Sequence, residues 1–319
     1  MLILAPMQGL TELLFRRAFQ RCYPGAFDMA VSPFLSITHG NLRDAGKKID
    51  DVLPEANEGS IPVVPQLLGR EPEGFVDLAN RLYDIGYNEI NWNMGCPMRR
   101  VAHKHRGSGI LPYPDEVCEI LDFVVPKMKS RLSVKLRLGY YSSDEIDCII
   151  PILNDYPLLN VTVHPRIGKQ IYSGLPDMVK FEEILPAIKH PVIYNGDVNT
   201  VYDYKKIRTS FPVVKDVMIG RGALYNPLLP IMIRNEFAAD FVNSQTMRTE
   251  NYPSVGQFIE TLMNDIMKSS MTRQAKSRKM KEYWCMLGKS LPQSEEQKRR
   301  VLHAVDLEDI LNLILEMAK

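Results

Sequence analysis

The chain has 319 residues, enough for a barrel-sized domain with an additional unit, and its 45% hydrophobic and 24% charged content is typical of a globular protein. The net charge of +1 gives no sign of a nucleic-acid partner, and no stretch has the apolar length of a membrane span. Five scattered cysteines, without metal-like pairs, argue against a disulfide framework and a zinc site. We therefore expect a cytoplasmic protein that needs neither a membrane nor a metal.

Short β-rich apolar runs recur along the first 220 residues, and amphipathic stretches such as Glu73–Ile85 lie between them. The first run opens the chain as a strand rather than as a signal peptide. Strands that alternate with helices pair in parallel, and eight such units close into a (β/α)8 TIM barrel. The eight predicted strands are Leu2–Ala5, Asp28–Ser32, Val63–Leu68, Glu89–Asn93, Ser133–Leu138, Asn160–His164, Pro191–Asn195 and Val217–Gly220.

The last part of the chain has a different character. From Ser254 to Lys319 no β-rich run occurs, and apolar residues fall at helical spacing, which predicts an all-α helical bundle. We expect a catalytic α/β barrel over residues 1–237, a linker over 238–253 and the bundle over 254–319. Thr272–Arg300 contains nine lysines and arginines against three acids, a local balance of +6 that suits a polyanion. A solvated helical face would explain the same run.

Polar residues close nearly every predicted strand, and in a barrel these strand ends gather on one face, where chemistry takes place. After the last two strands come the turns Asn195-Gly196-Asp197 and Gly220-Arg221-Gly222. Glycines there allow backbone N–H groups to approach an anion, and Arg221 adds a charge-assisted bond. The two turns predict the site of a phosphorylated cofactor. Tight turns without a ligand are the alternative.

Lys135 ends the fifth predicted strand and allows three interpretations. It could stabilise the negative charge of a reduced flavin, form a Schiff base as in aldolase-like barrels, or pair with an acid that lines the barrel. Gln66, at the end of the third strand, carries an amide that suits the edge of a planar heterocycle, or that simply caps the strand.

Cys96 lies in the sharp turn Gly95-Cys96-Pro97, which leads into a loop with four lysines and arginines, two histidines and no acid. A cysteine in such a turn is unlike a buried core cysteine. At an ordinary pKa its thiol stays protonated and can act as an acid. Arg99, Arg100 and Lys104 could lower that pKa and make it a nucleophile instead, and the sequence leaves both roles open.

Taken together, these motifs resemble those of the tRNA-dihydrouridine synthases, in the same order and over about residues 2–227. The helical tail takes the place of that family's RNA-binding domain. The matching segments are Ala5-Pro6-Met7, Gln66-Leu67-Leu68-Gly69, Asn93–Pro97, Val134–Gly139, Val163–Arg166, Asn195–Asp197 and Gly220–Pro227.

The resemblance implies that NADPH reduces bound FMN, that the reduced flavin delivers hydride to carbon 6 of a tRNA uridine, and that Cys96 protonates carbon 5. It also implies a monomer. FMN would be bound by Pro6, Met7, Gln66, Lys135, His164, Asn195, Gly196, Asp197, Gly220 and Arg221. The tRNA would be bound by Asn93, Arg99, Arg100, Lys104, Arg166, Arg273, Lys276, Arg278 and Lys279.

Two departures from the family pattern bear on the RNA. Pro165 stands where the family has glycine, and the loop His103-Lys104-His105 is unusually rich in histidine. The short N-terminus and the Arg273–Lys281 segment lean toward the C-type bacterial subgroup, which modifies the D arm. The competing hypotheses are an FMN barrel that reduces a small pyrimidine, as dihydroorotate dehydrogenases do, and an RNA-binding protein without activity.

Overall fold

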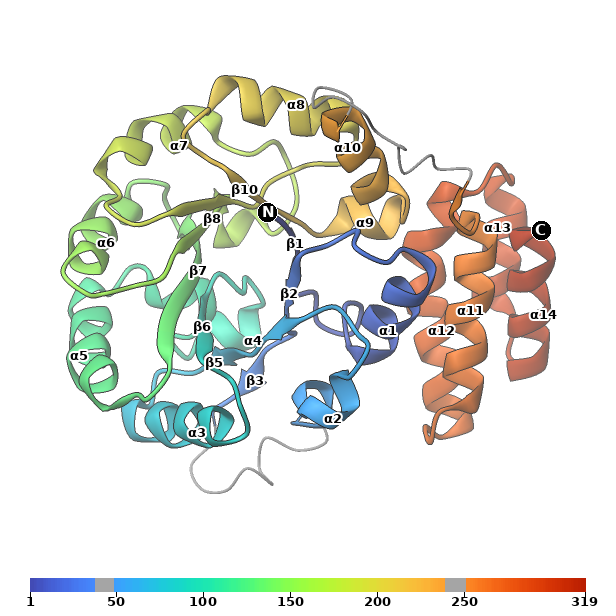
Figure 1. The fold of residues 1–319 in the computed structure, drawn as a ribbon, viewed down its shortest axis with the longest axis horizontal. Helices are drawn as coiled ribbons and strands as arrows, with labels where there is room; N and C mark the ends of the chain where they lie inside the picture. Colours follow the sequence, from blue (N-terminus) through green and yellow to red (C-terminus); the bar gives the residue numbers. More distant parts are fainter. Residues whose placement is uncertain (38–48, 239–250) are drawn as a thin grey trace.

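A computed structural model describes residues 1–37, 49–238 and 251–319. In Figure 1 a ring of strands surrounded by helices forms the larger part of the molecule, and a bundle of helices stands at its side. The strands, all paired in parallel, are β1 (Leu2–Leu4), β2 (Met29–Val31), β3 (Leu35–Ser36), β4 (Val63–Val64), β5 (Gln66–Leu68), β6 (Glu89–Met94), β7 (Arg131–Gly139), β8 (Val161–Ile167), β9 (Val192–Tyr194) and β10 (Asp216–Ile219).

The sheet closes on itself and forms the predicted barrel. Its hydrogen-bonded order runs β3-β5-β6-β7-β8-β9-β10-β1-β2-β4, so that β2 pairs with β4 at one end while β3 pairs with β5 at the other. Only Pro65 separates β4 from β5, and Pro33 stands between β2 and β3. A proline has no N–H and interrupts a ladder. The ten short strands therefore amount to eight staves, and two of the predicted strands are each broken at a proline.

Helices cover the outside of the barrel because each has one apolar face. In α3 (Pro72–Asp84), for example, Phe75, Leu78, Ala79 and Leu82 are buried, while Pro72 occupies the first turn, where no N–H is needed. The other helices of this part are α1 (Leu13–Cys22), α2 (Pro54–Asn57), α4 (Arg99–Ala102), α5 (Pro114–Val124), α6 (Glu145–Asn154), α7 (Met178–Ile184), α8 (Val201–Ser210), α9 (Arg221–Tyr225) and α10 (Leu229–Ala238).

The C-terminal bundle consists of α11 (Val255–Lys268), α12 (Arg273–Leu287), α13 (Glu295–His303) and α14 (Leu307–Ala318). Each of these helices begins at a capping side chain that accepts a backbone N–H, supplied in order by Ser254, Thr272, Ser294 and Asp306. The predicted linker over 238–253 lies for the most part outside the described residues. Among those that are described, no helix combines the length and apolar character needed to cross a bilayer.

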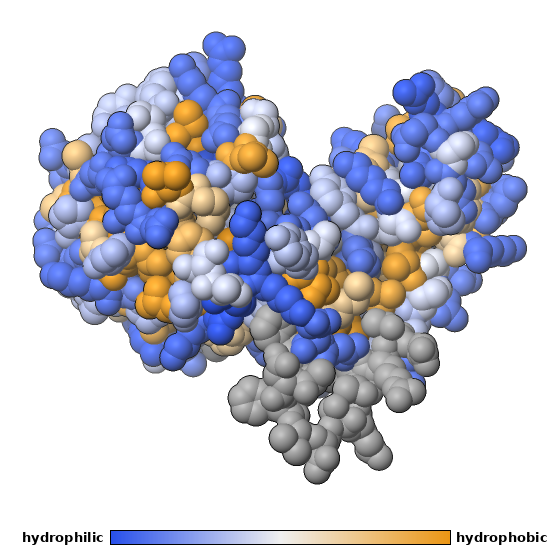
Figure 2. Space-filling model, turned by 90° about the horizontal axis from the view of Figure 1, so that it is seen from above, coloured by the Kyte–Doolittle hydropathy of each residue, from blue (hydrophilic) through white to orange (hydrophobic). Residues whose placement is uncertain are grey.

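The bundle packs against α1 of the barrel through aromatic rings. Phe15 and Phe19 of α1 each meet Phe258 of α11 edge-on, at centroid distances of 5.6 Å, and Phe15 stacks on Tyr283 of α12. All four rings are fully buried. Burial of such rings stabilises each by a few kcal/mol, so the bundle is firmly attached to this side of the barrel. Figure 2 shows a wide notch between the two units on the face that it presents.

Candidate active site

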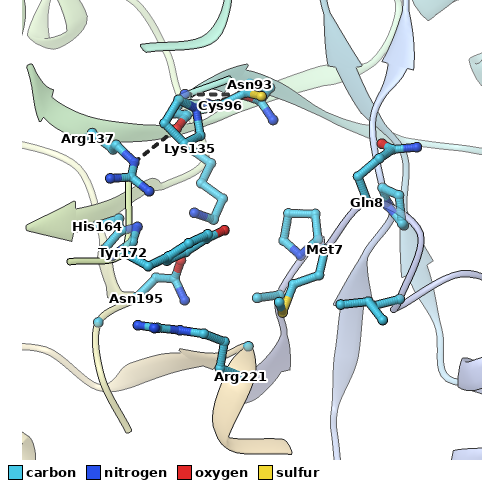
Figure 3. A pocket seen from close by; sticks show the side chains of 18 of the residues that line it. Met7, Gln8, Asn93, Cys96, Lys135, Arg137, His164, Tyr172, Asn195 and Arg221 are labelled. Carbon is cyan, nitrogen blue, oxygen red and sulfur yellow. Dashed lines mark hydrogen bonds between the residues drawn. The ribbon is translucent and has the colours of Figure 1, made fainter. Parts of the chain in front are cut away.

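A cavity of about 310 Å³ opens at the carboxyl ends of the barrel strands. It is lined by residues that follow β1, β6, β7, β8, β9 and β10, as the alternation of strands and polar strand ends predicts. Figure 3 shows Lys135, Tyr172 and Arg221 pointing into this space, with Met7 on the opposite wall. Of the residues predicted to bind cofactor or substrate, the cavity brings together Pro6, Met7, Asn93, Cys96, Lys135, His164, Asn195, Gly196, Asp197, Gly220 and Arg221.

The turn that carries Cys96 is held by hydrogen bonds from several sides. Oδ1 of Asn93 accepts from the backbone N–H of Gly95 at 3.1 Å and of Cys96 at 2.9 Å. Both the N–H and the hydroxyl of Ser108 donate to the carbonyl of Cys96, at 3.1 and 3.0 Å, and Nε of Arg137 donates to the carbonyl of Gly95 at 3.1 Å. The thiol is thereby fixed at the wall of the cavity.

Gln66 does not line the cavity but lies beneath it. Its side chain is fully buried, its Nε2 donates to Asn91 at 2.8 Å, and its Oε1 accepts from Nδ2 of Asn93 at 2.7 Å. Asn91 in turn donates to the hydroxyl of Ser133 at 3.0 Å. This chain of amides fixes which end of the Asn93 side chain faces the Cys96 turn. In this structure Gln66 therefore acts through Asn93.

Burial decides the protonation state of Cys96. Desolvation raises the pKa of its thiol, and this outweighs the N–H of Met98 and the cations of Arg137, Arg100 and Lys135, which lower it. Between the two roles that the sequence left open, the geometry favours the protonated thiol, which can donate a proton.

Lys135 and His164 stand next to each other on β7 and β8, and burial shifts both toward the neutral form. Desolvation, assisted by Arg137, lowers the pKa of Lys135 to about 7. Desolvation likewise lowers the pKa of His164 well below its ordinary value. Because Nη1 of Arg166 can only donate, Nε2 of His164 accepts at 3.2 Å and the imidazole carries its proton on Nδ1. An anion bound in the cavity would draw Lys135 back to its charged form.

Arg166 is not at the surface, where the sequence analysis expected it to contact RNA. It is 1% exposed and makes two hydrogen bonds to Asp197, at 2.9 and 2.7 Å, and a third to the carbonyl of Gly174. Arg221 donates to the same carboxylate at 2.6 Å. Although burial opposes it, the hydrogen bond and charge of Arg166 lower the pKa of Asp197. Arg166 thus holds Asp197 and, through it, the orientation of Arg221.

Three cavity residues were absent from the predicted site. The ring of Tyr172 lies 4.6 Å from the guanidinium of Arg221 and 5.5 Å from that of Arg137. Tyr172 and Arg137 both come from the region after a strand, and Arg137 was noted there without a role. Met286 reaches the cavity from α12 of the bundle, and no sequence pattern marks it.

The predicted RNA-binding residues fall into two groups. Arg99, Arg100 and Lys104 are exposed and line an open groove of about 790 Å³. On α12 the basic residues mostly have partners within the protein: Arg273 pairs with Asp306 and Glu308, Lys276 donates to the carbonyl of Met267, and Lys279 contacts the barrel. Arg278 is exposed and has no ion pair among the described residues. For Lys276 and Lys279 this corrects the expectation of a free phosphate contact.

The barrel and its cavity define a class of protein. Lys135, Arg137 and Arg221 face the cavity, and Asp197 is the one acid among its described lining residues. A closed (β/α)8 barrel whose mouth carries excess positive charge is an enzyme that receives an anionic cofactor or substrate. Within the described ranges, no three His, Cys, Asp or Glu side chains are placed to hold a metal ion.

Comparisons with known proteins give the family. The model of the dihydrouridine synthase family matches residues 3–318. A tRNA-dihydrouridine(16) synthase of Neisseria meningitidis serogroup B is 27% identical, covering 100% of this chain and 95% of the relative, and one of Cupriavidus necator is 32% identical, covering 73% of each. The chain therefore belongs to the dihydrouridine synthase family, and is an enzyme and an oxidoreductase.

Solved structures with a similar fold are old yellow enzymes. The homologue from Zymomonas mobilis aligns with a TM-score of 0.53 and 15% identity, over 79% of this chain and 95% of that one. The enzyme from Trypanosoma cruzi aligns with a TM-score of 0.52 and 10% identity, over 79% and 94%. At these identities the likeness confirms the barrel fold alone.

Gly107 provides a test of how the Cys96 turn is positioned. A methyl group added there would lie 2.6 Å from the carbonyl oxygen and 2.8 Å from Cβ of Cys96. We expect Gly107→Ala to displace the thiol and lower the rate of dihydrouridine formation by about tenfold or more, since misplacing a reacting group by about 1 Å has effects of this order. The assay is product formed per enzyme and minute.

The matched control is Gly59→Ala. Gly59 has a φ of +69° against +58° for Gly107, but a methyl group there meets nothing within 4 Å. Both variants carry similar backbone strain, so only the contact with Cys96 distinguishes them. Equal activity of the two variants would show that Gly107 does not position Cys96.

Proposed function

We propose that this enzyme reduces a uridine in the D arm of tRNA to 5,6-dihydrouridine, with FMN as bound cofactor and NADPH as reductant. The observation that carries the proposal is the protonated Cys96 thiol, held by backbone hydrogen bonds at the wall of a cationic barrel cavity. Reduction of the uracil 5,6 double bond needs a hydride and a proton. A reduced flavin, when bound, supplies the hydride.

The residues of the cavity suit a phosphorylated flavin. A volume of about 310 Å³ is at the lower end of the range for cofactor sites. The turn Gly220-Arg221-Gly222 offers backbone N–H groups and a guanidinium for the phosphate, and Asn195 and Asp197 offer polar groups for a ribityl chain. Lys135 offers a cation for the ring. Pro6, Met7, His164 and Gly196 would complete the FMN site, with Gln66 supporting it from below.

The chain's own residues then have distinct tasks. Cys96 holds the proton for carbon 5 of the uracil, and Asn93 keeps the Cys96 turn in place next to the substrate. Lys135 becomes charged and stabilises negative charge in the site. His164, neutral with its proton on Nδ1, contributes a hydrogen-bond donor.

The substrate uridine would leave its stack to enter the cavity, at a cost of a few kcal/mol. Phosphate contacts offset this cost. Arg99, Arg100 and Lys104 beside the cavity and Arg278 on α12 are exposed and suited to this task, and Arg273 has one exposed face. We propose that residues 254–319 form the tRNA-binding unit, and that RNA occupies the notch of Figure 2.

The target uridine is proposed from the relatives. Proteins named tRNA-dihydrouridine(16) synthases and a tRNA-dihydrouridine synthase B are both among them, and the former include the relative that covers all of this chain. We propose position 16, in the D arm, and a monomeric cytoplasmic enzyme. Sequencing of tRNA treated with the enzyme would locate the product, and dihydrouridine elsewhere would refute the position.

A small pyrimidine is the alternative substrate. The cavity alone suits such a molecule, whereas the exposed cations around it have no part in binding one. The two functions differ in a single comparison, the rate of NADPH oxidation with unmodified tRNA against free uridine or dihydroorotate-like pyrimidines. Stimulation by tRNA supports the proposal, and turnover with the small molecule alone supports the alternative.

The raised pKa of Cys96 has a consequence for its reactivity. Burial disfavours the thiolate, so the group stays protonated at neutral pH and loses its proton only above its ordinary value of 9.0. We expect iodoacetamide to alkylate Cys96 more slowly than free cysteine at pH 8, and the rate of dihydrouridine formation to fall only above about pH 9. Mass spectrometry of the Cys96 peptide gives the first rate. Rapid alkylation at pH 7 would instead indicate a thiolate nucleophile.

A further inference from the structure

The loop between β1 and α1 has two faces. One faces the cavity, where Pro6, Met7 and Leu10 form part of its wall. The other faces α12 of the bundle, to which the carbonyls of Gly9 and Leu10 are hydrogen-bonded. The loop is therefore the element through which the bundle contacts the cavity.

A single face of α12 makes these contacts. Nζ of Lys279 donates to the carbonyl of Gly9 at 2.8 Å and to Oε2 of Glu12 at 2.7 Å. The hydroxyl of Tyr283, one turn later, donates to the carbonyl of Leu10 at 2.8 Å. Met286, a further turn along, lines the cavity itself. Positions 279, 283 and 286 share one side of a helix, so the three contacts act together.

Neither Lys279 nor Tyr283 is available to an external ligand. The side chain of Lys279 is 13% exposed, and Tyr283 is fully buried with its ring stacked on Phe15, 13° from parallel. Hydrogen bonds to a charged donor contribute more than neutral ones. These side chains therefore stabilise the barrel loop.

The loop itself is compact, so a shift at one end is transmitted to the other. The hydroxyl of Thr11 donates to the carbonyl of Ala5 and accepts from the N–H of Met7, both at 2.8 Å. The N–H groups of Leu10 and Thr11 donate to the carbonyl of Met7, at 2.9 and 3.0 Å. The position of Met7 in the cavity thus depends on where Leu10 is held.

We propose that α12 is part of the cofactor site, and that Lys279 and Tyr283 are positioning residues that set the affinity for FMN by fixing the loop over residues 6–12. This rests on the proposed flavin function of the cavity. It assigns to the bundle a second task besides tRNA binding. It also explains why a lysine in a basic helix turns toward the barrel.

The test measures FMN binding rather than turnover. Apoprotein is titrated with FMN, and the dissociation constant is obtained from the change in flavin fluorescence, for the wild type, Lys279→Met and Tyr283→Phe. We expect about tenfold weaker binding for Lys279→Met, as for loss of a charge-assisted hydrogen bond, and a smaller loss for Tyr283→Phe, which keeps the ring and so the packing.

Lys281→Met is the matched control. Lys281 lies on the same helix but donates to the carbonyls of Leu302 and Ala304 within the bundle. This variant should lose stability while its FMN affinity remains that of the wild type. Thermal unfolding of all variants separates a loss of fold from a loss of positioning, and Tyr283→Phe keeps the test valid if Lys279→Met unfolds.

Two results would overturn the inference. One is wild-type FMN affinity in both Lys279→Met and Tyr283→Phe. The other is a loss of tRNA binding by Lys279→Met at unchanged FMN affinity, which would assign Lys279 to the RNA. Failure of the wild type to bind FMN would instead refute the proposed function, so the two failures are distinguishable.

Discussion

Replacing Cys96 with alanine is expected to lower the rate of dihydrouridine formation in tRNA by about 10²–10⁴, the usual contribution of a general acid. The thiol is the proton donor in the proposed reaction, and burial keeps it protonated. The rate is measured in a single turnover, with flavin reduced beforehand, so that the steps before proton transfer do not limit it.

The same variant should accept electrons from NADPH at the wild-type rate, because Cys96 does not take part in that step. Cys148→Ala serves as the control, since this exposed cysteine lies on α6 outside the barrel. A Cys96→Ala enzyme that forms product as fast as the control would remove Cys96 from the mechanism.

Lys135→Met is the second variant with a large expected effect. It removes a cation from the buried wall of the cavity, where electrostatic interactions are strong and where Arg137 already lowers its pKa. Loss of one such stabilising group lowers rates by about 10²–10³. We expect a loss of this size in the rate of flavin reduction by NADPH, followed by the absorbance of the oxidised flavin.

Lys206→Met is the comparison for this variant, because Lys206 is exposed on α8, on the outside of the barrel. Its flavin should be reduced as in the wild type. Reduction of the Lys135→Met enzyme at the same rate as Lys206→Met would mean that Lys135 does not stabilise the reduced cofactor.

The barrel could be predicted from the sequence because its signal is repeated eight times. All eight predicted strands occur in the structure, with boundaries that shift by a few residues. The breaks at Pro33 and Pro65 and the short strand Leu35–Ser36 were not predicted. A run such as Val63–Leu68 is apolar throughout, and its pattern does not show which hydrogen bonds a proline removes.

The cavity could also be predicted, since strand ends meet on one face of a barrel whatever their order in the chain. What a charged side chain contacts could not. Arg166 pairs with Asp197, 31 residues away, and Lys279 bonds to Gly9, 270 residues away. A charge pattern shows that cations are near one another, but only the fold decides whether they face solvent or an internal partner.

The account's central claim is that the enzyme makes dihydrouridine in tRNA with a flavin in the barrel cavity. The most direct test incubates purified protein with FMN, NADPH and unmodified tRNA, digests the tRNA and quantifies dihydrouridine by mass spectrometry. We predict dihydrouridine in an amount approaching one per tRNA, dependent on both FMN and NADPH. A protein that binds FMN and oxidises NADPH but leaves every uridine of the tRNA unreduced would contradict the claim.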